Sequence, residues 1–316
     1  MRTAMRFFSR KKRSPRLYTG VVAVLLLGLF VAGGVVVYNV KVQVDKEIYG
    51  TPRGEVKRET PAKYGLSYDV VTYKTDSDKE IAGWFIPNAQ SKNCIILAPG
   101  KGSTKWNVLK YAPFLYGGGY NVFLFDARGR GESEGERWGF SYFESRDILH
   151  GIDYVKEEYG MERFGLLGRS AGATASLLAA ADGRDIEAVV ADSGFASIKM
   201  AAMSYGDYQE SPLFQAVFPL YAFVARISLG VDVNGKTKVM DHVNEGDFAA
   251  FFIHGRDDEV ILPENSRVMY GAKKRRKRIW TPEGVEHVQT FDVHPKEYRT
   301  KVLDFFREHL RPYGTA

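Results

Sequence analysis

A serine lies between two glycines where an apolar segment of the chain gives way to a run of small residues. The pentapeptide Gly168-Arg169-Ser170-Ala171-Gly172 has the form G-x-S-x-G. Glycines two residues before and two residues after the serine let the backbone double back without side-chain collisions, so that the hydroxyl projects from the turn. Such a serine is suited to nucleophilic attack on an acyl carbon, whereas the pattern alone also fits a tight turn with an idle serine.

A nucleophilic serine needs a base to take its proton, and histidine suits this role because its ordinary pKa is about 6.5. Of the six histidines, His287 follows the last predicted strand, and a loop in that position reaches the edge at which strands end. His294 is the second candidate, although it precedes Pro295 at the start of the last predicted helix. His254 begins the turn after another strand and is expected to help build that turn.

An acid must in turn orient the histidine. Asp257 and Asp258 lie side by side in the loop after the predicted strand 249–253, and either carboxylate fits this role. Asp192, at the end of another predicted strand, is the third choice. Asp126 also follows a strand, but its Asp-Ala-Arg-Gly-Arg-Gly context favours a structural role in a turn.

The segments around these residues alternate between short apolar runs and amphipathic stretches. Strands are predicted at 66–73, 81–86, 94–98, 121–125, 164–167, 187–191, 249–253 and near 278–281, the first two as a hairpin. Helices are predicted at 105–116, 142–158, 171–182, 264–272 and 296–310. The fold class is therefore α/β, with a mostly parallel eight-stranded sheet covered by helices on both faces. Such a sheet collects its chemistry at the carboxyl ends of its strands.

The alternation stops between residues 195 and 247. Methionine and aromatic residues recur there at helical spacing, and the segment is too long for a simple connection. It predicts one to three helices over the strand ends, forming a small cap that shapes a hydrophobic pocket. The alternative is that these helices complete the core.

The N-terminal region predicts a membrane anchor. Residues 1–16 carry seven lysines and arginines and no acid, and residues 19–40 contain no charge. A helix of about 20 apolar residues spans a bilayer, whereas a cleaved signal peptide has a shorter apolar region. We expect a basic cytoplasmic tail at 1–18, a single transmembrane helix at 19–40, a polar linker at 41–63 and a folded domain at 64–316 outside the cytoplasm.

The composition limits the other classes of function. The formal charge of the 316 residues is +6, so the part after the basic N-terminal tail carries about −1, which gives no reason to expect nucleic-acid binding. Cys94 is the only cysteine, so no intramolecular disulfide is possible. No Cys/His spacing typical of zinc sites occurs, and we expect neither a metal nor an organic cofactor.

Four separated motifs together resemble the α/β-hydrolase superfamily, in particular bacterial membrane-bound serine hydrolases of the serine-aminopeptidase-like (S33) type. They are Gly168–Gly172, Asp126-Ala-Arg-Gly-Arg-Gly-Glu-Ser133, His254-Gly-Arg-Asp-Asp-Glu-Val260 and Gly284-Val-Glu-His287. The family's aspartate stands two residues before the valine, so the resemblance selects Asp258 over Asp257. The chain order Ser170, Asp258, His287 is the order used by this fold.

The resemblance implies a role for each residue. Ser170 attacks an acyl carbon, His287 acts as base and then acid, and Asp258 fixes the histidine tautomer. The backbone N–H groups of Lys101 and Ala171 form the oxyanion hole. The chain departs from the family at the loop that supplies Lys101, because Pro99 stands where the family usually has histidine.

The expected function is that of a cell-membrane serine hydrolase, a carboxylesterase-like or peptidase-like enzyme that cleaves an ester, a thioester or an amide through an acyl-enzyme. The expected substrate is a small-molecule or lipid-like acyl compound. Two alternatives are a catalytically silent hydrolase fold that binds partners in the cell envelope, and an acyltransferase with the same acyl-enzyme.

Overall fold

The structure is a computed structural model that describes residues 15–183, 185–204 and 211–310. Most of the predicted basic tail at 1–18, and residues 205–210 of the predicted cap, lie outside the described residues.

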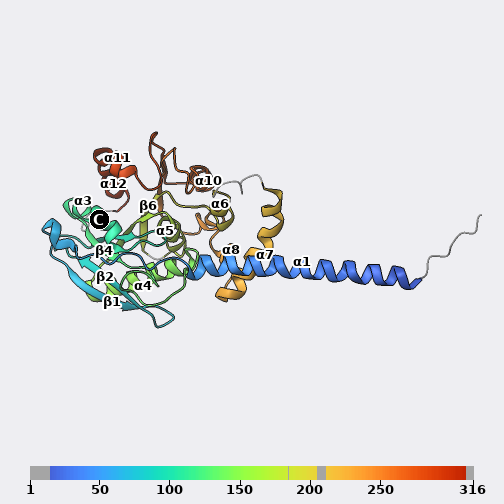
Figure 1. The fold of residues 1–316 in the computed structure, drawn as a ribbon. Coiled ribbons are helices and arrows are strands. Elements are labelled where there is room, and N and C mark those ends of the chain that lie inside the picture. Colours follow the sequence, from blue (N-terminus) through green and yellow to red (C-terminus); the bar gives the residue numbers. More distant parts are fainter. Residues whose placement is uncertain (1–14, 184, 205–210, 311–316) are drawn as a thin grey trace, which may run out of the picture.

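An eight-stranded, mostly parallel sheet forms the centre of the molecule (Figure 1). Its strands are β1 (Asp69–Lys74), β2 (Glu80–Ile86), β3 (Asn93–Ala98), β4 (Asn121–Phe125), β5 (Arg163–Arg169), β6 (Ile186–Asp192), β7 (Ala249–Ile253) and β8 (Lys277–Trp280). They lie in the order β1-β2-β4-β3-β5-β6-β7-β8, and only the β1/β2 and β2/β4 pairs are antiparallel. The predicted sheet is thereby confirmed.

Helices cover both faces of this sheet, which explains why β3 and β4 are buried at every position. One face packs against α4 (Tyr142–Tyr159), α5 (Ala171–Ala181) and α10 (Glu264–Ala272). The other packs against α2 (Lys105–Val108), η2 (Leu109–Tyr111), α3 (Ala112–Gly117), α11 (Thr290–Val293) and α12 (Pro295–His309). A single turn of 3-10 helix, η1 (Pro61–Tyr64), precedes β1.

The helix predicted at 105–116 is divided into three short pieces. Pro113 lies in the first turn of α3. Proline has no N–H and clashes with the preceding helical turn, so a continuous helix cannot run through this position.

The N-terminal helix α1 (Pro15–Tyr49) is longer than the predicted span. Residues 41–49, predicted as part of a linker, continue the helix, because Val40, Val44 and Ile48 recur every four residues and are buried on the domain. The residues from Val22 to Asn39 are exposed, and Figure 1 shows this part of α1 projecting from the body of the molecule.

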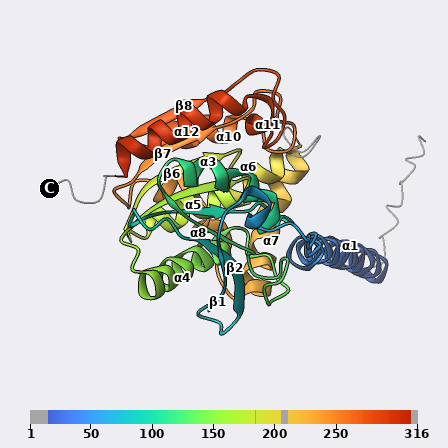
Figure 2. The same ribbon diagram turned by 90° about the vertical axis from the view of Figure 1, so that its left-hand side faces the viewer.

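The predicted cap region contains four helices among its described residues rather than one to three. They are α6 (Ile198–Met203), α7 (Pro212–Leu229), α8 (Val233–Lys236) and α9 (Val239–His242). The first three share a hydrophobic cluster with α1, whereas α9 packs on the sheet with α5. Figures 1 and 2 show α7 crossing α1 where α1 meets the domain.

Two helices in the described part of the chain are long and apolar enough to cross a membrane by length and composition, α1 from Val22 and α7. They differ in their contacts. The apolar window of α1 has no buried residue, whereas α7 buries Phe218, Val224 and Leu229 against the domain.

A buried ion pair fixes the loop between β3 and α2. The ammonium of Lys105 lies 2.5 Å from a carboxylate oxygen of Asp126, and both side chains are fully buried. The carboxylate of Asp126 also accepts hydrogen bonds from the backbone N–H groups of Lys105 and Glu132. The carboxylate therefore holds two loops together, in agreement with the structural role expected from its sequence context.

Replacement of Lys105 by methionine would leave the carboxylate of Asp126 buried without its cation. We expect the free energy of unfolding to fall by about 3–5 kcal/mol, which lowers the melting temperature by on the order of 10 °C. Circular dichroism of the detergent-solubilised full chain would measure this. Lys110→Met, at the surface pair with Asp292, is the control and should cost less than about 1 kcal/mol; equal losses would contradict the role assigned to Lys105.

Candidate active site

Ser170 occupies a strained turn between β5 and α5. Its φ and ψ angles are +52° and −122°, a conformation that non-glycine residues seldom adopt. A Cβ atom added to Gly168 would lie 2.3 Å from the carbonyl oxygen of Gly172, and one added to Gly172 would lie 2.3 Å from that of Ala98. Both positions of the G-x-S-x-G motif therefore require glycine, because no room exists for a side chain.

The structure brings Ser170, His287 and Asp258 together. Nε2 of His287 lies 3.0 Å from Oγ of Ser170, and Nδ1 of His287 lies 2.7 Å from Oδ2 of Asp258. A carboxylate accepts hydrogen bonds, so Nδ1 carries the proton in the neutral ring and Nε2 is free to accept the serine hydroxyl. The three residues come from loops after β5, β7 and β8, which end at one edge of the sheet.

The carboxylate of Asp258 is held in its charged form. Burial raises its pKa, but hydrogen bonds from His254 and His287 and from the backbone N–H of Ile261 outweigh burial, so the pKa lies well below its ordinary value. Nε2 of His254 lies 3.0 Å from Oδ2 of Asp258 and 2.7 Å from the carbonyl oxygen of Ile261. His254 is fully buried and builds the turn as predicted, and it also fixes Asp258.

The other sequence candidates lie elsewhere. Asp257 is exposed and lies outside this series, whereas Asp258 is the carboxylate that contacts His287. Asp192 is buried beneath the site, where burial raises its pKa, and it accepts hydrogen bonds from Tyr298 and Ser193. His294 is the N-cap residue of α12, and its ring lies tilted beside that of Trp280.

The loop after β3 and the start of α5 both lie next to Ser170. A Cβ atom on Gly100 would lie 3.2 Å from Cβ of Ser170, so the loop after β3 passes directly beside the serine. Neither the N–H of Lys101 nor that of Ala171 donates to an acceptor within the described residues. Ala171 begins α5, where the first N–H groups have no acceptor within the helix.

Three residues that the sequence analysis did not select hold the loop of His287. Val288 has a φ of +53°, which is strained for a β-branched residue. The guanidinium of Arg169 donates a hydrogen bond to the carbonyl oxygen of Val288 at 3.1 Å. The backbone N–H of Val288 donates to Oγ of Ser193 at 3.3 Å. Arg169 occupies a variable position of the motif and therefore carries no signal in the sequence.

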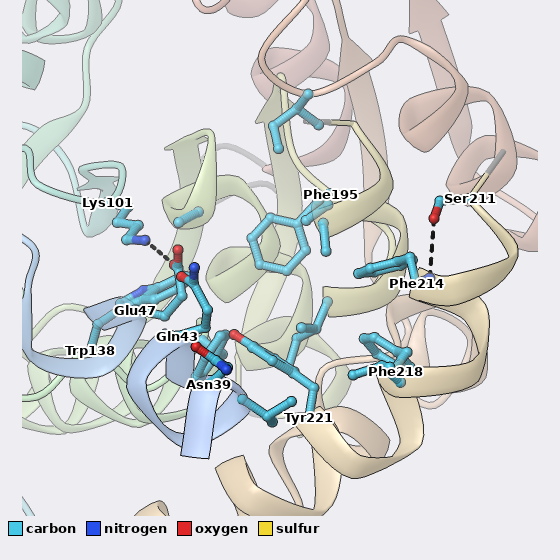
Figure 3. Close-up of a pocket in the computed structure, with 18 of the residues that line it drawn as sticks. Asn39, Gln43, Glu47, Lys101, Trp138, Phe195, Ser211, Phe214, Phe218 and Tyr221 are labelled. Carbon is cyan, nitrogen blue, oxygen red and sulfur yellow. Dashed lines mark hydrogen bonds and ion pairs between the residues drawn. The ribbon is translucent and has the colours of Figure 1, made fainter. Parts of the chain in front are cut away.

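A cavity of about 440 Å³ opens beside Ser170 (Figure 3). Most of its lining is apolar and comes from α6, α7 and the loop around Trp138. The C-terminal part of α1 supplies a further wall, which the prediction of a polar linker had missed. The four-residue spacing of Val40, Val44 and Ile48 was the available signal.

Glu47 of α1 also forms an ion pair with the ammonium of Lys101 (Figure 3). That ammonium lies 4.2 Å from the ring centre of Trp138. The backbone N–H of Trp138 donates to the carbonyl oxygen of Ile48, on α1, at 2.8 Å. The loop that lacks the family's histidine is therefore braced by α1. No group of histidine, cysteine and carboxylate side chains in the described ranges has the arrangement of a metal site.

Comparison with known proteins agrees with this fold. The family described as serine aminopeptidase, S33, matches residues 89–230. The solved esterase Pf2001 of Pyrococcus furiosus is 26% identical, with a TM-score of 0.69 over 83% of this chain and 98% of its own. The chain belongs to the α/β-hydrolase superfamily.

Two curated relatives extend the comparison. The uncharacterized protein YqkD of Bacillus subtilis is 26% identical to this chain, and the match covers 72% of this chain and 75% of YqkD. The mouse monoglyceride lipase is 30% identical over 42% of this chain and 44% of its own.

We expect Arg169→Met to act on turnover through the position of His287. The variant loses two hydrogen bonds, to the carbonyl oxygens of Val288 and Asn107. At about 1 kcal/mol for each bond, kcat for p-nitrophenyl butyrate should fall about ten-fold or more, while KM changes little because Arg169 does not line the cavity. Arg163→Met, at the other end of β5, is the matched control, and a loss carried by KM instead of kcat would contradict this role.

Proposed function

We propose that the protein is a membrane-anchored serine hydrolase that cleaves a carboxylic ester through an acyl-enzyme. One observation carries the proposal: the continuous hydrogen-bonded series from Ser170 through His287 to an ionised Asp258. A catalytically silent binding module needs neither the strained serine nor a charged carboxylate behind the histidine. Similarity to an esterase and to a monoglyceride lipase favours an ester among the possible acyl substrates.

In the first half of the reaction, Oγ of Ser170 attacks the carbonyl carbon while Nε2 of His287 takes the hydroxyl proton. The carbonyl oxygen becomes an oxyanion and accepts hydrogen bonds from the backbone N–H groups of Lys101 and Ala171. Asp258 stabilises the imidazolium without itself taking the proton. Collapse of the tetrahedral intermediate breaks the ester bond, and the departing alkoxide takes the proton from His287 and leaves as an alcohol.

In the second half, a water molecule attacks the acyl-enzyme and His287 takes its proton. A second tetrahedral intermediate forms on the same oxyanion donors. Its collapse returns the proton to Oγ of Ser170 and releases the carboxylic acid, which restores the starting state.

A fluorophosphonate probe tests the activated serine. Full-length protein in detergent should be labelled, and Ser170→Ala and His287→Ala should abolish labelling because one removes the nucleophile and the other its base. Ser103→Ala and His294→Ala serve as controls that lie outside the series. Labelling that persists in Ser170→Ala would overturn the proposal.

The two adjacent carboxylates give a matched pair for the acid. Asp258→Asn should lower kcat for p-nitrophenyl butyrate by about 10⁴-fold, because the histidine loses the partner that sets its tautomer. Asp257→Asn changes an exposed side chain in the same loop and should leave kcat within about two-fold. Equal losses in both variants would exclude a specific role for Asp258.

We further propose that α1 anchors the protein with residues 1–18 in the cytoplasm and the catalytic domain outside. The support is the exposed apolar surface of α1 and the seven positive charges that precede its apolar part.

The buried state of Cys94 makes the topology measurable. Burial raises the pKa of its thiol, so the native chain should react little with maleimide. In intact cells of a bacterial host, a membrane-impermeant maleimide should label Glu157→Cys, on the exposed surface of the domain, and should not label Arg6→Cys until the cells are lysed. The reverse pattern would refute the proposed orientation.

A further inference from the structure

The end of the membrane-anchor helix forms part of the cavity beside Ser170. Asn39, Val40, Gln43 and Glu47 of α1 all line it, together with Ser170 itself. Figure 3 shows the labelled residues of α1 on one side of the cavity and Phe214 and Phe218 of α7 on the other, with Tyr221 of α7 extending toward α1. The anchor is therefore a wall of the site and does more than tether the domain.

The cavity opens at the level where α1 would leave the bilayer. Residues 19–40 rise about 33 Å as a helix, close to the thickness of the hydrocarbon core of a membrane. The proposed span thus ends at Val40, and Lys41 is the first charged residue that follows it. Asn39 and Gln43, which are exposed residues of the lining, lie at this boundary.

The outward face of α7 suits the same boundary. Leu213, Phe223 and Ile227 are 73%, 59% and 68% exposed, so this helix presents apolar side chains to its surroundings along its length. Arg226 is its only charged residue. Because α7 crosses α1 (Figures 1 and 2), a helix α1 that spans the bilayer would lay α7 along the membrane surface.

The lining chemistry favours an acyl chain over a peptide as the occupant. Among the described residues that line the cavity, the charged ones are Glu47 and Lys101, and these form an ion pair with each other. The remaining lining is mostly aliphatic and aromatic. The described part of the lining therefore leaves no unpaired charge for the termini or charged side chains of a peptide.

We propose that α1 and α7 form a passage from the bilayer to Ser170, and that the substrate is a long-chain acyl ester resident in the membrane. Its acyl chain enters between the two helices without crossing water, and its ester group stops at Ser170. This inference rests on the proposed serine hydrolase function and on the proposed anchoring by α1.

Two fluorogenic esters test the passage in full-length protein reconstituted into phosphatidylcholine nanodiscs. 4-Methylumbelliferyl butyrate reaches the site from water, and 4-methylumbelliferyl oleate resides in the bilayer. Gln43→Trp places a large side chain at the rim on α1. We expect it to lower oleate hydrolysis at least ten-fold relative to butyrate hydrolysis. Lys46→Trp, an exposed position of α1 that does not line the cavity, is the matched control and should leave the ratio unchanged.

The outcomes separate the inference from the function on which it rests. Wild type that hydrolyses neither ester and takes no fluorophosphonate label refutes the hydrolase itself. Wild type that hydrolyses butyrate but not oleate refutes the membrane-resident substrate. If Gln43→Trp lowers both rates equally or neither, the passage along α1 is refuted. Should that variant fail to fold, Leu213→Trp tests the rim on α7 by the same ratio.

Discussion

The structure depends on a turn in which two glycine positions have no room for a side chain. The serine at the junction of β5 and α5 has a positive φ angle, and the glycines on either side contact the backbone of β3 and of the helix that follows. The N–H of Ser170 is held by the carbonyl oxygen of Asp192 at 2.7 Å, on the neighbouring strand β6. The sheet thereby fixes the position of the hydroxyl, and the surrounding loops adopt conformations that meet it.

The loop of His287 shows what this constraint requires of its surroundings. Val288 has an unfavourable backbone conformation, and hydrogen bonds from Arg169 and to Ser193 hold it there. Arg169 ends β5 and Ser193 directly follows β6, so both partners are fixed by the sheet. Strain at one position is thus offset by contacts that originate in the rigid sheet, which keeps the imidazole within reach of both Ser170 and Asp258.

The N-terminal helix links this site to the surface at which the protein is proposed to work. Its apolar half is exposed, its last turns are packed on the domain, and Glu47 reaches the loop of Lys101. Pro99 stands where the family usually has histidine, and the ion pair between Lys101 and Glu47 of α1 supports this loop instead. Loss of α1 would therefore affect both the cavity wall and the loop beside the serine.

The sequence alone determined the sheet, the elbow of Ser170 and the loops that hold Asp258 and His287, because hydrophobic periodicity and glycine positions are local properties. It left Asp257 and Asp258 equivalent until the family pattern was applied, and it gave no sign of Arg169 or Ser193. Only the tertiary structure decided that 41–49 continues a helix whose buried face closes the cavity. The reason is physical: a mostly polar segment whose buried face carries an apolar residue every four positions becomes ordered only when another surface covers that face.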